Sequence, residues 1–529
     1  MRTNSFVRFI VGGAFAALSL APVFSAQAAP KPSPITPAKM PRIATIDDRF
    51  QSYNVEMVEV TGGRFWKPYA STQKTDAAAG NQPTGMSASL YEYRKPIDLY
   101  NPRLRKLAAA LAPAYVRVSG TWANTTYFQD ANAASTDKVP DGFKAILTRE
   151  QWKGVIDFSN AADAPIVTSF AISTGARDAS GAWTPAQAKE VLDFTRANHG
   201  TIAAIELMNE PTMPEMGGSP KGYNAASFIK DLAVFHTFVK DFDPKIVTLG
   251  PGSVGEEGKV IPPTLSGVML AKDILSGGAQ YFDAFSYHTY GAVSSRCGSM
   301  GAMATTTLEA ALSDDWLARG DQSEQYYGAL RDHYMPGKPM WNTETAQAAC
   351  GGDRWASTFV DSFRYLNQLG ALAKRGVQVQ LHNTLAASDY GLLQEYTFEP
   401  RPNYWSALLW RKLMGTTVLD ASTSPAKSLH LYAHCLRNQP GGVVLLAINA
   451  SETDAQSLKV PAKSERYTLT SKELIDRAVQ LNGVELKLGA DDSLPEIKGQ
   501  ATHAGTVTFA PKSITFLAIP DAHNVTCSQ

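Results

Sequence analysis

Two glutamates, Glu210 and Glu344, are the residues of this chain whose type and placement most directly suggest chemistry. Glu210 lies in Ile-Glu-Leu-Met-Asn-Glu-Pro (205–211) and Glu344 in Pro-Met-Trp-Asn-Thr-Glu-Thr (339–345). Each ends a short apolar run typical of a buried strand. A carboxylate there is costly unless it has a partner or performs chemistry. A pair of such carboxylates, brought together, is the equipment that cleaves a glycosidic bond.

The immediate neighbours of the glutamates bear on this hypothesis. Asn209 can hydrogen-bond a sugar hydroxyl while Glu210 protonates the leaving oxygen. The alternative is a helix N-terminus, with Glu210 in the first turn and Pro211 at the helix start. For Glu344 alone, the alternative is a salt-bridged carboxylate at a strand end. The presence of both glutamates in matching positions favours catalysis.

Other polar residues end neighbouring predicted strands. His288 and Tyr290 close the run Tyr287-His288-Thr289-Tyr290 and can hold a nearby carboxylate ionised and oriented. The alternative is that they pack in an aromatic cluster. Arg117 lies in a predicted strand and needs an acidic partner inside a barrel, for which Glu344 is a candidate. A purely structural role is the alternative for Arg117.

The two glutamates are 344 − 210 = 134 residues apart, so they meet only if the fold gathers distant strand ends on one face. Strand-like and helical patterns alternate along the chain, which predicts a (β/α)₈ barrel over residues 53–414. In that order Glu210 follows strand four and Glu344 follows strand seven. The predicted strands are Asn54–Val60, Ala114–Ser119, Pro165–Phe170, Ala203–Met208, Lys245–Leu249, Phe282–Tyr287, Pro339–Thr343 and Val377–His382. The predicted helices include Pro102–Ala112, Pro185–Asn198, Ala225–Asp241, Gln322–Tyr334 and Ala356–Lys374.

The pattern changes after about residue 415, where short strands separated by turns predict a β-sandwich over residues 415–529. These strands are Leu429–Cys435, Val443–Asn449, Ser457–Val460, Arg466–Thr470, Thr506–Phe509 and Ile514–Ile519. Residues 29–52 begin as a Pro-rich leader, and a strand from this segment is a candidate addition to the sandwich. Residues 1–28 have the positive start, apolar stretch and Ala-Gln-Ala end of a secretory signal peptide, with a membrane anchor as the alternative. We therefore expect a secreted or periplasmic protein.

Composition excludes several classes of partner. The 529-residue chain has 49 basic and 49 acidic residues, so no global field attracts nucleic acid or membranes. It has no HExxH, Walker or strand-following GxGxxG motif, and we expect neither a metal nor a cofactor. The four cysteines allow three disulfide pairings, and their wide spacing is unlike that of a zinc site. We expect a monomer whose partner is a polysaccharide substrate.

Several motifs together resemble one known family, the heparanases and β-glucuronidases of glycoside hydrolase family 79. The resemblance runs from about residue 50 to the C-terminus. It is carried by residues 111–121 (Leu-Ala-Pro-Ala-Tyr-Val-Arg-Val-Ser-Gly-Thr), 208–211 (Met-Asn-Glu-Pro), Glu344-Thr345 with Gly351-Gly352, Asp389-Tyr390, Pro402-Asn403-Tyr404-Trp405, Leu431-Tyr432-Ala433-His434-Cys435 and Cys527.

The resemblance implies a retaining mechanism with Glu210 as general acid/base and Glu344 as nucleophile. It also implies that Tyr390 and the backbone N–H groups of Gly351 and Gly352 hold the sugar carboxylate. The full set of expected substrate-binding residues is Glu56, Thr121, Asn209, His288, Tyr290, Gly351, Gly352 and Tyr390, with Arg117 as structural support.

Two disulfides are expected. The resemblance implies Cys435–Cys527, which joins early and late strands of the sandwich. Cys297–Cys350 would join the loops after predicted strands six and seven, which are neighbours on the catalytic face.

The resemblance further implies an endo-β-glucuronidase that cleaves heparan sulfate-like glycosaminoglycans. The alternatives are an exo-acting β-glucuronidase, which releases terminal glucuronic acid, and a non-catalytic carbohydrate-binding protein. Basic residues in predicted loops near the strand ends could meet sulfates beside the cleaved sugar, although each could equally be a solvated surface residue. They are Arg64, Lys67, Arg296, Arg354 and Arg401.

Overall fold

The computed structural model describes residue 1 and residues 33–72, 81–129, 138–258, 260–261, 267–300, 305–422 and 424–528. The expected signal peptide at 1–28 lies outside the described residues, apart from its first residue. No helix in the described ranges is both long enough and apolar enough to cross a membrane.

Eight parallel strands form a closed barrel in chain order, as the sequence predicts. They are β3 (Gln51–Glu56), β6 (Val116–Ser119), β9 (Ile166–Ser169), β10 (Ile202–Glu206), β11 (Val247–Val254), β12 (Ala284–Tyr290), β13 (Met340–Ala346) and β14 (Val379–His382). The barrel interior is filled by alternate strand residues, among them Ala204, Leu249 and Trp341. Glu210 and Glu344 lie beyond these packed side chains, towards the C-terminal ends of the strands.

Each barrel strand is followed along the chain by a helix. The helices are α2 (Pro102–Ala109), α3 (Arg149–Ala161), α4 (Ala186–Ala197), α5 (Ala225–Phe242), α6 (Ala271–Gly278), α7 (Asp314–Tyr334), α8 (Phe359–Lys374) and α9 (Pro402–Leu413). Local sequence sets several starts: Asn101 caps α2 by accepting from the N–H groups of Arg103 and Leu104, and Pro102 suits the first turn. The (β/α)₈ prediction is therefore confirmed.

Two local predictions were wrong, and three helices were not predicted. The strand expected at Asn54–Val60 ends at Glu56, because Glu56 and Glu59 form a capping box that starts the short helix α1 (Met57–Thr61). The helices α3, α6 and α9 were not predicted. Glu344 lies inside β13, which continues to Ala346, rather than after the strand.

The chain after α9 forms two stacked sheets, as expected. The larger sheet has the order β2-β15-β16-β17-β24-β19-β20-β21, with β22 also paired to β19, and the smaller sheet has the order β1-β18-β23. Their strands are β1 (Ser33–Pro34), β2 (Arg42–Thr45), β15 (Met414–Leu419), β16 (Leu429–Leu436), β17 (Val443–Asn449), β18 (Gln456–Val460), β19 (Ser464–Thr470), β20 (Gln480–Leu481), β21 (Val484–Glu485), β22 (Gln500–Thr502), β23 (Gly505–Phe509) and β24 (Ser513–Ile519). Leu445, Leu458 and Leu517 belong to the apolar core between the sheets.

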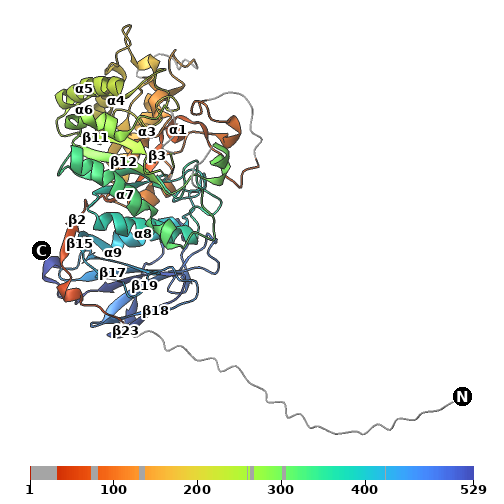
Figure 1. Ribbon diagram of the computed structural model, residues 1–529, viewed down its shortest axis with the longest axis vertical. Coiled ribbons are helices and arrows are strands. Elements are labelled where there is room, and N and C mark those ends of the chain that lie inside the picture. The colour runs from red at the N-terminus through yellow and green to blue at the C-terminus, as the bar shows by residue number, and fades with distance from the viewer. Residues whose placement is uncertain are drawn as a thin grey trace.

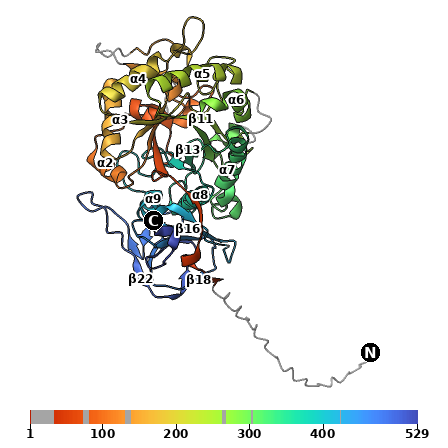
Figure 2. The same ribbon diagram turned by 90° about the vertical axis from the view of Figure 1, so that its left-hand side faces the viewer.

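The sandwich is attached to the barrel through helices α8 and α9, which contact the larger sheet on the face away from the smaller one (Figures 1 and 2). The first described segments also join it. β1 pairs with β18, and β2 pairs with β15, so residues from both ends of the chain share the same sheets.

The loop between β3 and α2 makes a separate excursion over the barrel rim. It contains the antiparallel hairpin of β4 (Gly63–Trp66) and β5 (Tyr91–Arg94). Trp66 stacks on Tyr91 with ring centroids 4.6 Å apart, and Tyr91 meets Trp122 of the loop after β6 edge-on. This aromatic contact holds the excursion beside the C-terminal ends of the barrel strands.

Candidate active site

The alternation of β12 places three polar side chains on the inside of the barrel. Ser286, His288 and Tyr290 are two residues apart, so they point to the same face. Ser286 donates to Glu206, His288 contacts Glu210, and the Tyr290 hydroxyl donates to Glu344 Oε1 at 2.6 Å. All three are buried. One strand thus contacts Glu206, Glu210 and Glu344.

Glu344 reaches the same centre because of an irregularity in β13. The pairing of β12 with β13 shifts by one residue between the pairs Tyr287–Asn342 and His288–Glu344. This extra residue allows both Thr343 and Glu344 to face inward: Thr343 donates to Glu206 and Glu344 accepts from Arg117. The bulge therefore orients the Glu344 carboxylate towards the barrel interior. The regular alternation expected of a strand does not predict this bulge.

Glu210 is held in an uncommon backbone conformation, with φ of 46°. Asn124 holds the backbone of the preceding residue, Asn209, through two hydrogen bonds. The Asn124 side chain accepts from the Asn209 N–H at 2.8 Å and donates to the Asn209 carbonyl at 2.9 Å. A positive φ at a non-glycine residue persists where the surroundings enforce it, and functional sites are where such residues gather.

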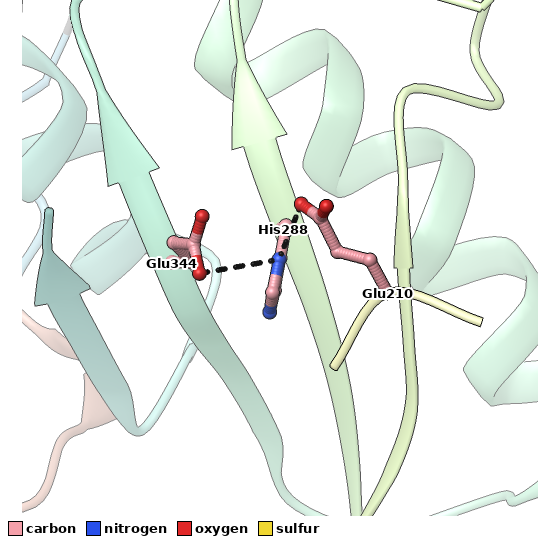
Figure 3. Close-up of side chains that lie close together, drawn as sticks. All are labelled: Glu210, His288 and Glu344. Carbon is pink, nitrogen blue, oxygen red and sulfur yellow. Dashed lines mark hydrogen bonds and ion pairs between the residues drawn. The ribbon is translucent and has the colours of Figure 1, made fainter. Parts of the chain in front are cut away.

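The two glutamates flank His288 (Figure 3). His288 Nδ1 lies 2.9 Å from Glu210 Oε1 and 3.7 Å from Glu344 Oε2. One carboxylate oxygen of each glutamate and the histidine nitrogen all lie within 4.8 Å of one another. The expectation that distant strand ends bring Glu210 and Glu344 together therefore agrees with the structure.

Arg117 provides the buried positive charge beneath the glutamates. It is 1% exposed and donates to Glu344 Oε2 at 2.9 Å, to Glu206 Oε2 at 2.9 Å and to Asn209 Oδ1 at 2.8 Å. A buried guanidinium requires this degree of pairing. Sequence reasoning named Glu344 as a candidate partner and missed Glu206, although a second carboxylate within the buried run Ile205-Glu206-Leu207 was the available signal.

The surroundings move the pKa values of the two glutamates in opposite directions. Burial raises the pKa of Glu210, helped by the Glu344 charge and opposed by the hydrogen bond to His288. Burial would also raise the pKa of Glu344, but His288, Arg117 and the Tyr290 hydroxyl stabilise its ionised form enough to lower it. These opposite directions favour the protonated form of Glu210 and the ionised form of Glu344.

Above this centre lies a cleft with an empty volume of about 830 Å³. Of the residues expected to bind substrate, Glu56, Thr121, Tyr290 and Tyr390 line it together with both glutamates. Asn209 and His288 are buried against the lining, where Asn209 also reaches Thr121 Oγ1 at 3.5 Å. Residues that sequence reasoning did not single out also line the cleft: Trp66, Pro83, Met86, Tyr91, Trp122, Met213, Met216, Val254, Val260, Ile261, Val293, Ala349, Cys350 and Asn383.

Glu56 is the fourth carboxyl of the site. It is buried, and its Oε2 has no hydrogen-bond partner among the described residues. Burial, and then the charge of Glu344, raise its pKa well above the usual value. A protonated Glu56 offers a donor to a ligand hydroxyl. The Cα of Gly120 lies so close that a Cβ there would meet Glu56 Oε2 at 1.5 Å, so only glycine fits beside it.

Gly351 and Gly352 follow the cleft wall rather than line it. Both have left-handed φ values, 80° and 79°, which favour glycine. They come directly after Cys350, which is in the lining and is disulfide-bonded to Cys297. The other expected disulfide, Cys435–Cys527, is also formed, in the sandwich. The first disulfide ties the loop after β13 to the loop after β12.

The five basic residues expected near sulfates have other contacts or positions, and none of them is among the lining residues of the described cleft. Arg401 is buried and donates to the carbonyls of Ser388, Asp389 and Gly391, which corrects the prediction for this residue. Arg296 pairs with Asp389 at 2.7 Å. Arg354 lies over the Tyr69 ring. Arg64 is in β4 and Lys67 comes just after it.

Glu210, His288 and Glu344 are also the side chains that could together supply ligands to a metal ion. Arg117 already places a positive charge 2.9 Å from Glu344 Oε2. A divalent cation beside Glu344 would be repelled by that guanidinium, so the arrangement suits carboxylate chemistry better than metal binding.

A closed (β/α)₈ barrel that holds two neighbouring carboxylates at the C-terminal ends of strands four and seven defines this protein as a glycoside hydrolase. The sequence model "Glycosyl hydrolase family 79, N-terminal domain" matches residues 87–370, and the chain belongs to this family.

Relatives agree over most of the chain. A hyaluronoglucuronidase of Hirudo nipponia is 26% identical over 82% of this chain and 92% of its own length. The heparanase of Mus musculus is 28% identical over 81% and 88%. A baicalin-β-D-glucuronidase of Scutellaria baicalensis is 24% identical over 83% and 86%.

A solved structure supports the fold. The 4-O-α-L-rhamnosyl-β-D-glucuronidase from Fusarium oxysporum superimposes with a TM-score of 0.63, at 12% identity, over 93% of this chain and 99% of that one.

Proposed function

We propose that the protein is a retaining β-glucuronidase, with Glu344 as nucleophile and Glu210 as general acid/base. The observation that carries this proposal is the pair of carboxyl groups. One oxygen of Glu210 lies within 4.8 Å of one oxygen of Glu344, and the pKa values of the two groups are shifted in opposite directions. Retaining enzymes hold their carboxyl groups about 5–5.5 Å apart, whereas inverting enzymes need about 6.5–9.5 Å to admit a water.

In the first step Glu344 attacks the anomeric carbon, and the bond to the leaving oxygen breaks as Glu210 donates its proton to that oxygen. The product is a glycosyl ester of Glu344. In the second step Glu210, now ionised, takes a proton from water, and the resulting hydroxide equivalent displaces Glu344 at the anomeric carbon. Two displacements on opposite faces restore the β configuration.

The glucuronate recognition is a further part of the proposal. Glu56, Thr121 and Asn209 bind ring hydroxyls, and Tyr390, which lines the cleft, binds the carboxylate. Asn383 donates to both the Tyr290 and Tyr390 hydroxyls, at 3.1 and 3.2 Å, and so positions them.

The names of the relatives support glucuronic acid as the sugar, since heparanase, hyaluronoglucuronidase and baicalin-β-D-glucuronidase are among them. Internal cleavage of heparan sulfate and release of terminal glucuronic acid stay as alternative modes for this chain. Size-exclusion chromatography of digested heparan sulfate separates them, because internal cleavage shortens the polymer early whereas terminal release leaves its size unchanged. The two disulfides favour an oxidising compartment, in agreement with export.

The stereochemistry of the first product tests the mechanism. Proton NMR during hydrolysis of an aryl β-D-glucuronide should show β-glucuronic acid first, followed by slow appearance of the α anomer through mutarotation. Initial α product would contradict the retaining geometry. Absence of hydrolysis with any glucuronide would favour the non-catalytic alternative.

The opposite pKa shifts predict a bell-shaped dependence of kcat/KM on pH. The rate falls on the acid side as Glu344 gains a proton, below the ordinary glutamate pKa, because the pKa of Glu344 is lowered. It falls on the alkaline side as Glu210 loses its proton, above the ordinary value, because the pKa of Glu210 is raised. The two limbs belong to the coupled pair. A rate that still rises above neutral pH would contradict the roles assigned to Glu210 and Glu344.

A further inference from the structure

The rim of the cleft is divided into a polar and an apolar half. The polar half lies over β14, β3 and β6, which are consecutive in the barrel, together with the hairpin strand β5. The apolar half lies over β10, β11, β12 and β13, which are also consecutive. The polar half contributes Glu56, Tyr91, Thr121, Trp122, Asn383 and Tyr390. The apolar half contributes Met213, Met216, Val254, Val260, Ile261, Val293 and Ala349. The same strands and their loops also carry Glu210, Tyr290 and Glu344, and the excursion between β3 and α2 adds the apolar lining residues Trp66, Pro83 and Met86.

Unpartnered polar atoms occur on the polar half. Within the described chain, Glu56 Oε2, Tyr91 Oη, Trp122 Nε1 and Asn383 Oδ1 are buried and have no hydrogen-bond partner. Buried polar atoms of this kind are normally satisfied, and these four residues all line the cleft, where the hydroxyls of a ligand can pair with them. The sugar ring therefore belongs on this half.

The leaving group belongs on the other half. Glu210 must reach the leaving oxygen to protonate it, and Glu210 lies in the loop after β10, which also carries Met213 and Met216. Val254 and Val293 are both buried and make the adjoining wall. The disulfide at Cys350 holds the far end of this wall. Methionine side chains adapt to ligands of different shape, whereas the valines form a fixed surface.

The described lining of this half supplies no positively charged side chain to pair with a sulfated leaving group. No arginine or lysine is among the lining residues in the described part of the chain. A sulfate placed against methionine and valine would lose water without gaining a counterion, which is costly. An apolar group placed there removes its own surface and that of the wall from water, which is favourable.

We propose that the leaving-group half of the cleft is a subsite for apolar aglycones, so that the preferred substrates are glucuronides of alkyl or aromatic alcohols rather than glucuronides linked to a sulfated sugar. This inference rests on the proposed β-glucuronidase function and names the substrate class of the same site. Met213, Met216, Val254 and Val293 are the residues that determine the preference.

A series of methyl, propyl, butyl and hexyl β-D-glucuronides tests the subsite, because their leaving alcohols differ mainly in apolar area. Each methylene that becomes buried is expected to raise kcat/KM about three- to fourfold. We therefore expect kcat/KM to rise at least about tenfold from methyl to butyl. A flat or falling series, with measurable hydrolysis of every member, would overturn the subsite while leaving the β-glucuronidase function intact. No hydrolysis of any member would reject both.

The double variant Met213→Ser/Met216→Ser tests whether these two methionines produce the preference for apolar leaving groups. Both side chains are half-buried in a loop, and the variant is expected to reduce the butyl-to-methyl ratio of kcat/KM at least threefold. The matched control is Val484→Ser, an exposed apolar residue of β21 in the sandwich, which should leave the ratio unchanged. An unchanged ratio in the double variant, or a higher kcat/KM on a sulfated heparan oligosaccharide than on the butyl glucuronide, would refute the proposal.

Discussion

Replacement of Glu344 by glutamine is expected to lower kcat on an aryl β-glucuronide by at least about 10⁴-fold, the scale seen when a covalent nucleophile is removed. Glutamine keeps the shape of the side chain but cannot form the ester with the anomeric carbon. Arg117 would keep its hydrogen bonds to Glu206 and Asn209, so the site should remain assembled. Steady-state kinetics measures the loss, and circular dichroism and the melting temperature check the fold.

A matched control is Glu309→Gln, which removes a fully exposed carboxylate and should leave kcat unchanged. The smaller variant Glu344→Ala adds a chemical test. Azide can enter the vacated space and attack the anomeric carbon while Glu210 protonates the leaving oxygen, and the product is an α-glucuronyl azide. A Glu344→Gln enzyme with wild-type kcat would remove this residue from the mechanism.

The barrel and the meeting of the two glutamates were predictable because both depend on local sequence. Short apolar runs that alternate with helical patterns identify the eight strands, and the polar residue at the end of each run is then on the catalytic face. Asn209-Glu210 and Glu344 are of this kind. The disulfide Cys297–Cys350 follows from the same order of loops, since the loops after neighbouring strands are themselves neighbours.

The missed features depend on how distant strands meet. The choice of Glu206 as partner of Arg117 arises only when the barrel places β6 and β10 on either side of β9. The bulge at Thr343 is a property of the pairing between β12 and β13. Asn383 follows β14 without any charge or motif to mark it, yet it positions two tyrosines.

The basic residues show that tertiary contacts can also remove a residue from the set that the sequence suggests is available to a ligand. A loop arginine in a sequence looks available to a ligand, but Arg401 is consumed by three carbonyls of the loop after β14. The Trp66 and Tyr91 side chains come from an excursion between β3 and α2, and only the tertiary structure brings them to the cleft. Sequence patterns therefore identified the two glutamates that meet at one end of the barrel, but missed many of the side chains that line the cleft.

Replacement of Glu210 by alanine is expected to lower kcat/KM about 10²–10⁴-fold on an alkyl β-glucuronide, whose leaving oxygen needs a proton. A dinitrophenyl glucuronide should lose much less in the first step, because its leaving group departs without protonation. The second step still lacks its base, so the glycosyl ester of Glu344 should accumulate. Rapid-quench kinetics would then show a burst of dinitrophenol close to one equivalent of enzyme.

Azide distinguishes this variant from the Glu344 variant. In Glu210→Ala, azide needs no base to displace Glu344 from the glycosyl ester, and two successive displacements give a β-glucuronyl azide. The Glu344→Ala enzyme, which allows only one displacement, should give the α product. The opposite configurations follow from placing the two carboxyls on opposite faces of the sugar, with the ionised one attacking and the protonated one donating. Equal losses on alkyl and dinitrophenyl glucuronides in Glu210→Ala, with no azide product, would show that Glu210 supports the site without transferring a proton.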